Sequence, residues 1–282
     1  MKIMLSFLLI AIYLPLNAAE IKNFLNNPSF SKVCSLAMRS QKVTLPGTEE
    51  PRSGYVKTRP LFFESKNYFF VAMKDLYSLK GDYKISKYNK SSNDETFLAS
   101  FTKPIRDIVA IDDDNLILLF DKSILLIDLS AKKSRSISIP RSSKIGVNDH
   151  AYGMVLEGDV VHIANGTEGV TSISLKTHKA NSIDMGLIQP TGHYSIAVSV
   201  SQSKGSELIV GVDNLTAPNR QSSPFNGIKK VDILTKKVSS FPYNPKSAGV
   251  LVRVARTIIN DETLWVNNWG TLQKINLNDL NK

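Results

Sequence analysis

Hydrophobic and polar positions alternate along most of this chain in short runs, and one arrangement of runs recurs five times. In each copy a strongly apolar run begins near residue 68, 116, 160, 208 or 264. Four of these runs follow an acidic or amide turn, which suits a tight antiparallel hairpin. Short apolar runs bounded by such turns predict buried strands. We therefore expect five copies of one β-sheet unit.

A third strand with alternating polarity follows in each copy. Apolar residues two positions apart, with a polar residue between them, predict a strand that buries one face. The four clearest copies are Ile127-Asp128-Leu129, Ile173-Ser174-Leu175, Val231-Asp232-Ile233 and Ile275-Asn276-Leu277. In the first unit the nearest match is Tyr83 to Tyr88. A Lys/Asn/Thr turn and a short strand ending in Pro or Gly complete each unit.

Four-stranded units that repeat every 40–50 residues are typical of β-propeller blades. The turns Asp128–Lys133 and Asp232–Lys237 resemble those of bacterial YncE-like and quinoprotein-like propellers, which are similar to WD40/YVTN repeats. This resemblance covers about residues 56–282. It implies a propeller architecture and does not imply a particular function. The expected blades span about residues 56–103, 104–145, 146–189, 190–246 and 247–282. Two separate β-sandwiches remain the alternative.

The last unit stops directly after its third strand, and we expect its outer strand to come from another part of the chain. Residues 41–46 have the form of the outer strands in other units and have no unit of their own. We expect this segment to complete the last blade and to close a five-bladed, all-β propeller, because closure removes exposed strand edges. Apolar spacing in residues 20–39 predicts two short amphipathic helices before the closing strand.

The first 19 residues have the layout of a secretory signal peptide. Lys2 precedes an apolar run that ends in small residues, with cleavage expected after Ala19, or after Ala18 as the alternative. The run is short for a membrane span, although an N-terminal anchor is the alternative. Cys34 is the only cysteine, so no internal disulfide forms, and it is either half-buried or a thiol for intermolecular pairing. We expect a secreted or periplasmic monomer without a membrane span.

The processed chain is basic. Removal of Lys2 leaves 34 of the 35 basic residues against 25 acidic ones, a net charge of about +9. The pattern of hydrophobic and polar residues places the lysines at strand ends and turns, as in Lys132-Lys133, Lys229-Lys230 and Lys236-Lys237. Export excludes genomic nucleic acid as a partner. A basic surface in that compartment favours anionic envelope polymers or acidic proteins, unless it is merely solvated.

The propeller resemblance implies a binding site where loops entering the innermost strands meet loops between second and third strands. The candidate ligand-binding residues carried onto this face are Arg59, Arg106, Asp107, His150, His193, Arg220, Arg256, Asn268 and Trp269. Converging guanidinium groups favour a carboxylate or phosphate ligand. His150 and His193 with Asp107 or Asp149 form an alternative metal set, but the spacing of these residues does not support a metal, so none is expected.

These observations favour a non-catalytic binding or scaffold protein that recognises a protein partner or an anionic envelope ligand. The long loop from Asp213 to Gly227 and Trp269 give this face an individual contact surface. No cofactor or catalytic residue is expected, because no nucleophile motif or phosphate-binding loop is present. A hydrolase of the glycosidase or lactonase kind, with its site in the channel, is the alternative function; it would require two or three converging carboxylates.

Overall fold

The computed structural model describes residues 61–74, 83–92, 94–141, 150–188, 194–213, 227–242, 254–260, 263–268 and 271–277. The predicted signal peptide, the helical segment at 20–39 and the closing strand at 41–46 lie outside these residues. Within the described ranges the chain is all-β, and its strands form five antiparallel sheets, each built from consecutive strands.

The first two sheets contain four strands each. The first sheet consists of β1 (Leu61–Glu64), β2 (Tyr68–Lys74), β3 (Tyr83–Asn89) and β4 (Glu95–Phe101). The second sheet consists of β5 (Asp107–Ala110), β6 (Asn115–Leu119), β7 (Ser123–Asp128) and β8 (Lys133–Ser138). In both sheets every strand pairs with the next one along the chain, as hairpin connections dictate.

The same order continues in the remaining sheets. The third sheet consists of β9 (Gly153–Glu157), β10 (Val160–Ala164), β11 (Val170–Ser174) and β12 (Ala180–Ile183). The fourth sheet consists of β13 (Ile196–Gln202), β14 (Glu207–Asp213), β15 (Gly227–Asp232) and β16 (Val238–Pro242). The fifth sheet has three described strands, β17 (Val254–Asn260), β18 (Thr263–Asn268) and β19 (Thr271–Asn276). The five apolar runs predicted from the sequence are β2, β6, β10, β14 and β18.

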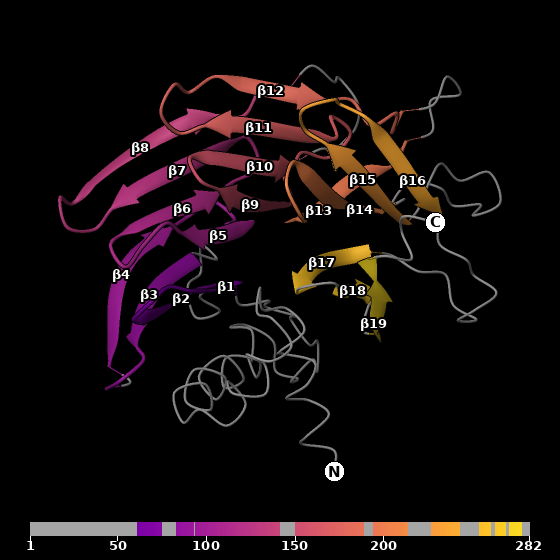
Figure 1. The fold of residues 1–282 in the computed structure, drawn as a ribbon. Coiled ribbons are helices and arrows are strands. Elements are labelled where there is room, and N and C mark those ends of the chain that lie inside the picture. The colour runs from indigo at the N-terminus through magenta and orange to yellow at the C-terminus, as the bar shows by residue number, and fades with distance from the viewer. Residues whose placement is uncertain are drawn as a thin grey trace, which may run out of the picture.

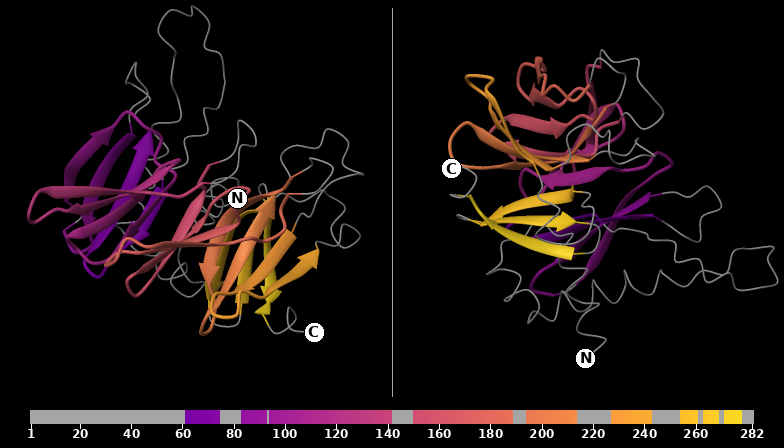
Figure 2. Two further views of the ribbon diagram at one scale, coloured as in Figure 1. Left: turned by 90° about the horizontal axis from the view of Figure 1, so that it is seen from above. Right: turned by 90° about the vertical axis from the view of Figure 1, so that its right-hand side faces the viewer.

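The sheets follow one another with their first strands inward. Strand β1 contacts β5, β5 contacts β9, β9 contacts β13, and β13 contacts β17. Figure 1 shows these first strands around a common centre, with β4, β8, β12 and β16 on the outside. The two further views in Figure 2 show the fifth sheet, in yellow, beside the fourth sheet, in orange. In each sheet the strands therefore run in sequence order from the centre toward the outside.

The apolar run of β6, Leu116–Leu119, is continuous because this strand has no solvent-exposed face. In β6, Leu116 and Leu118 pack into a core shared with the first sheet, whereas Ile117 and Leu119 pack into a core shared with the third sheet. All four side chains are at most 1% exposed. Successive side chains of a strand point to opposite faces, so burial on both faces demands a continuous apolar run rather than alternation.

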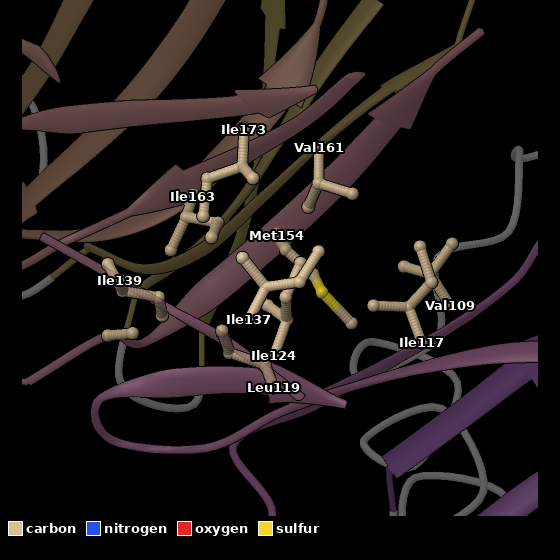
Figure 3. Packing of buried hydrophobic residues seen from close by; sticks show 11 residues of the cluster. Val109, Ile117, Leu119, Ile124, Ile137, Ile139, Met154, Val161, Ile163 and Ile173 are labelled. Atoms are coloured by element: carbon tan, nitrogen blue, oxygen red, sulfur yellow. The ribbon is translucent and has the colours of Figure 1, made fainter. Parts of the chain in front are cut away.

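One hydrophobic core fills the space between each pair of consecutive sheets. Figure 3 shows Ile117, Leu119 and Ile124 of the second sheet directed toward Val161 and Ile163 of the third. A comparable cluster joins the third and fourth sheets, and a smaller one joins the fourth and fifth. Each of the second, third and fourth sheets therefore contributes to two cores, one on either face.

The turn between the third and fourth strands keeps one geometry through three sheets. Lys132, His178 and Lys236 occupy the same position in it and have φ values of 53°, 59° and 58°. In the second and fourth sheets the turn begins with Asp128 or Asp232, whose carboxylate accepts backbone N–H bonds from the turn. The repeat in the sequence is therefore a repeat of backbone geometry.

Polar contacts join neighbouring sheets at the turns as well. Asp113, between β5 and β6, accepts hydrogen bonds from Ser65 Oγ at 2.5 Å and from the backbone N–H of Asn67 at 3.1 Å, both between β1 and β2. Burial alone would raise the pKa of Asp113, but the hydrogen bonds from Ser65 and Asn67 and the nearby Lys87 hold it below its ordinary value. The ionised carboxylate thus connects the first two sheets.

Candidate functional site

In the second and third sheets, the residue that precedes the first strand lies beside the end of the second strand. The backbone N–H of Arg106, just before β5, donates to the carbonyl of Leu119 at the end of β6 (2.7 Å). The equivalent bond in the third sheet runs from Tyr152 to Ala164 (2.9 Å). We call this side of the sheets the entrance end. The candidate site predicted from the sequence belongs to it.

Arg106 forms an ion pair with Asp121 at the entrance end. Its Nε donates to Asp121 Oδ1, and the two side chains are 31% and 41% exposed. The backbone carbonyl of Asp121 also accepts the N–H of Ala151, which lies in front of β9 (3.2 Å). A guanidinium group carries five N–H donors, so the bond from Nε leaves others that can bind a ligand. The carboxylate of Asp121 lowers the net positive charge of this location.

An aromatic pair lies next to this ion pair. The rings of His150 and Tyr152 are 5.1 Å apart between centroids and inclined by 31°, and both residues are half-buried. They flank Ala151, whose N–H binds the carbonyl of Asp121. We refer to Arg106, Asp121, His150 and Tyr152 as the entrance cluster. It combines a guanidinium group, a carboxylate and two flat rings from two successive sheets, a combination suited to polar planar groups.

Asp107 faces the interior instead. It is 3% exposed, and its two carboxylate oxygens accept the backbone N–H groups of Ile108 (3.0 Å) and Met154 (2.9 Å). Gly153 lies directly beside it, since a Cβ on this glycine would be 3.6 Å from Asp107 Oδ2. The carboxylate therefore joins β5 to β9 at the start of both strands.

The remaining predicted residues divide into two groups. Arg256 and Asn268 lie on β17 and β18, where the register pairs Arg256 with Asn267 and Val254 with Asn268, so both are near the same end of the fifth sheet. The others lie outside the described residues: Arg59, His193, Arg220 and Trp269. Among the residues that are described, no three His, Cys, Asp or Glu side chains gather as a metal site would require.

A row of polar side chains that the sequence analysis missed crosses the third sheet. His162 Nδ1 is 2.8 Å from Ser172 Oγ, and His162 Nε2 is 3.1 Å from Glu157 Oε2. The three residues lie on β10, β11 and β9, so no linear motif reveals them, although the hairpin register could have. Ser172 is at the buried end of the row and is 9% exposed. Both ring nitrogens of the buried His162 imidazole therefore have hydrogen-bond partners.

Burial lowers the pKa of His162 below its ordinary value of 6.5, although the neighbouring Glu157 acts in the opposite direction. The unfolded chain takes up a proton near pH 6.5, whereas the folded chain does so only at lower pH. Acidification through this range therefore favours the unfolded chain, and we expect the free energy of unfolding to decrease.

This expectation is tested by urea unfolding at about pH 7.5 and about pH 5.5. The decrease in unfolding free energy should be smaller in His162→Gln than in the wild-type chain, because the titrating group is gone. His178→Gln, in the exposed turn after β11, is the matched control and should keep the wild-type decrease. An undiminished decrease in His162→Gln would contradict the assignment.

Comparison with known proteins gives a structural likeness only. No protein-family model matches the chain, and no curated protein sequence matches it. Two solved structures with similar folds are the extracellular domain of a protein of B. thetaiotaomicron, BT4673, described in one case as a hybrid two-component system and in the other as a one-component system. The TM-scores are 0.55 and 0.56, with 13% sequence identity over 80% of this chain.

The chain spans 28% of the length of those two structures. At this identity the likeness concerns the fold, a series of antiparallel β-sheets. No helix among the described residues has the length and hydrophobicity that a membrane span requires.

Proposed function

We propose that this chain is an exported five-bladed β-propeller that acts as a binding or scaffold protein. Its partner, a protein or an anionic envelope ligand, binds at the entrance end. The observation that carries the proposal is the entrance cluster, in which residues of the second and third sheets lie together. The hydrophobic core between these two sheets supports the cluster. Sites placed on such rigid supports are typical of binding domains.

The packing of the sheets supports a propeller over two sandwiches. A sandwich has one core between two sheets. Here each of the three middle sheets contributes to two cores, and the first strands lie around one centre. Radial order of strands and cores between successive sheets are what propeller blades produce.

The outer face of the first sheet supports closure of the ring. Phe69 and Val71 point away from the second sheet, yet they are only 1% and 5% exposed. Phe97 lies on the same face, in register with Val71 through Ser86, and is 58% exposed at the outer edge. A complete last blade would pack against this face. We propose that residues 41–46 add the fourth strand to the fifth sheet, beside β19, and cover Phe97.

Export is supported by two independent features. The first 19 residues have the layout of a signal peptide. The similar solved structures are extracellular domains, by their own descriptions. We propose that the processed protein lies in the periplasm or outside the cell, where its net charge of about +9 favours anionic partners.

The binding role is tested with Arg106→Ala combined with His150→Ala. The chain, immobilised, is exposed to an envelope extract of its host, and the retained molecules are compared with those retained by the wild type. We expect the specifically retained partner to bind about tenfold more weakly, because a hydrogen bond to a charged group contributes about 1.5–3 kcal/mol. The melting temperature should change little, since the Arg106–Asp121 pair is partly exposed.

Lys132→Gln with Lys133→Gln is the matched control, because these residues lie at the opposite end of the second sheet. It should retain the same partner as the wild-type chain. Equal retention by all three proteins would contradict binding at the entrance end. A large loss of thermal stability in the Arg106/His150 variant would instead show that these residues stabilise the fold.

A further inference from the structure

An exposed leucine is found at the end of the fourth sheet that lies opposite the entrance end. Leu234, in the turn between β15 and β16, is 82% exposed, the highest value among the large hydrophobic side chains whose exposure the structure describes. The equivalent positions of the second and third sheets hold Ser130 and Lys176. The turn itself therefore does not require an apolar residue here.

The turn holds Leu234 in a fixed, outward position. Asp232 Oδ1 accepts the backbone N–H groups of Leu234 at 2.9 Å and of Thr235 at 3.1 Å. The N–H of Asp232 donates to the carbonyl of Lys237 at 3.0 Å, which closes the turn. Because these bonds fix the backbone, the leucine cannot fold back to bury itself without breaking them.

Lysines surround this leucine. Lys236 and Lys237 follow it in the same turn, and both are exposed. Lys204, also exposed, lies in the adjacent turn between β13 and β14. The two turns are joined, since the N–H of Ile233 donates to the carbonyl of Ser206 at 2.9 Å. We refer to Leu234, Lys236 and Lys237 as the Leu234 patch.

Two acidic groups near the patch, Asp232 and Glu207, are engaged within the protein. Asp232 binds the turn, and Glu207 pairs with Lys230 at 3.1 Å. At the corresponding ends of the second and third sheets, the inner turns contain residues 112–114, all aspartate, and Asp159. The fourth sheet is therefore distinguished by combining an exposed leucine with lysines in both of its adjacent turns.

We propose that the Leu234 patch binds an anionic lipid surface. An aliphatic side chain at the tip of a turn can enter the boundary of the acyl chains while the surrounding ammonium groups attract the lipid headgroups. A stable protein partner would need about 800 Å² on each side, more than a single turn offers. This contact is separate from the ligand proposed for the entrance end, and the two can be present together.

The test is co-sedimentation of the processed full chain with lipid vesicles. Vesicles of phosphatidylcholine with about one-third phosphatidylglycerol should bind the protein, and vesicles of phosphatidylcholine alone should bind it weakly. Leu234→Ser, which installs the residue found at the equivalent position of the second sheet, should reduce the partition coefficient about tenfold. Lys236→Gln with Lys237→Gln should reduce it by a similar factor.

Lys132→Gln with Lys133→Gln is the control, since these lysines lie in the same turn of the second sheet, without the leucine and beside the three aspartates. It should bind the anionic vesicles within about twofold of the wild type. Every variant keeps the same N-terminal segment, so any affinity of that segment for lipid is common to all. The proposal is overturned if wild-type protein does not bind anionic vesicles, or if the control loses as much binding as the patch variants. Unchanged binding of Leu234→Ser would show a purely ionic contact and would also overturn it.

Discussion

Replacing Gly169 with alanine is expected to destabilise the fold by about 3 kcal/mol. Gly169 has a φ of +78°, which an alanine adopts at a cost of about 1 kcal/mol or more. A Cβ at this position would lie 2.6 Å from the carbonyl oxygen of Ile183 and 2.9 Å from Cγ of Met185. The carbonyl belongs to β12, which is paired with β11 at this point, so it cannot move away without opening the third sheet.

The matched control for this substitution is Gly158→Ala. Gly158 has a φ of +57°, but no atom lies within 4 Å of the Cβ that alanine would add. Only the cost of the backbone conformation, about 1 kcal/mol, is expected. Urea unfolding of both variants measures the difference directly. A loss of stability in Gly169→Ala no larger than that in Gly158→Ala would contradict the close packing of β11 against β12.

The second large effect is expected for Leu119→Ala. Leu119 is fully buried in the core between the second and third sheets, and deletion of a buried leucine side chain to alanine costs about 2–5 kcal/mol. Leu118→Ala should cost a similar amount, although Leu118 faces the other core, shared with the first sheet. Two neighbouring residues that destabilise the protein equally are expected only if both faces of β6 are buried.

Leu234→Ala makes the same chemical change at an exposed site and serves as the control. It should alter the free energy of unfolding by no more than about 0.5 kcal/mol. Thermal or urea unfolding of the three variants gives the comparison. If either Leu118→Ala or Leu119→Ala resembled Leu234→Ala, one face of β6 would be exposed to solvent, and the series of cores between sheets would be wrong.

The strands could be predicted from the sequence because burial on both faces leaves a strong pattern. Continuous apolar runs identify the second strands, and alternating runs identify the third strands. The third strand of the first unit is harder to recognise in the sequence, because the turn after it lacks the Asp-Leu or Asp-Ile pattern. The structure shows that Asn89 begins this turn and accepts the N–H groups of Ser91 and Ser92. An asparagine thus does what Asp128 and Asp232 do in other sheets.

Contacts between sheets could not be predicted, because they depend on how separate strands face each other. The sequence pattern placed Lys229 at a strand end or turn, and this prediction was wrong. Lys229 lies within β15, is 7% exposed, and donates to the carbonyl of Met185 at 2.9 Å and to Ser240 Oγ at 3.1 Å. Burial lowers its pKa, although Asp184 acts in the opposite direction. An ammonium group joins the third and fourth sheets.

The sequence predicted in part which residues lie together at the entrance end. Residues at strand entrances were expected to meet the loops between second and third strands, and Arg106 does bind Asp121 of such a loop. The pairing of His150 with Tyr152 cannot be predicted from the sequence, since it depends on ring orientation. The sequence could not distinguish Arg106, which is partly exposed, from its neighbour Asp107, which is buried, because alternation along a strand changes the environment from one residue to the next.

The central claim, that a strand from the N-terminal part of the chain closes the ring beside β19, is tested most directly by amide hydrogen exchange. In β19, alternate N–H groups bind β18, and the others point away from it. If residues 41–46 pair with this edge, both sets of amides in residues 271–276 should be protected in the wild-type chain. Protection of only the set that binds β18, with the outward set exchanging at the rate of unstructured peptide, would contradict a closed propeller.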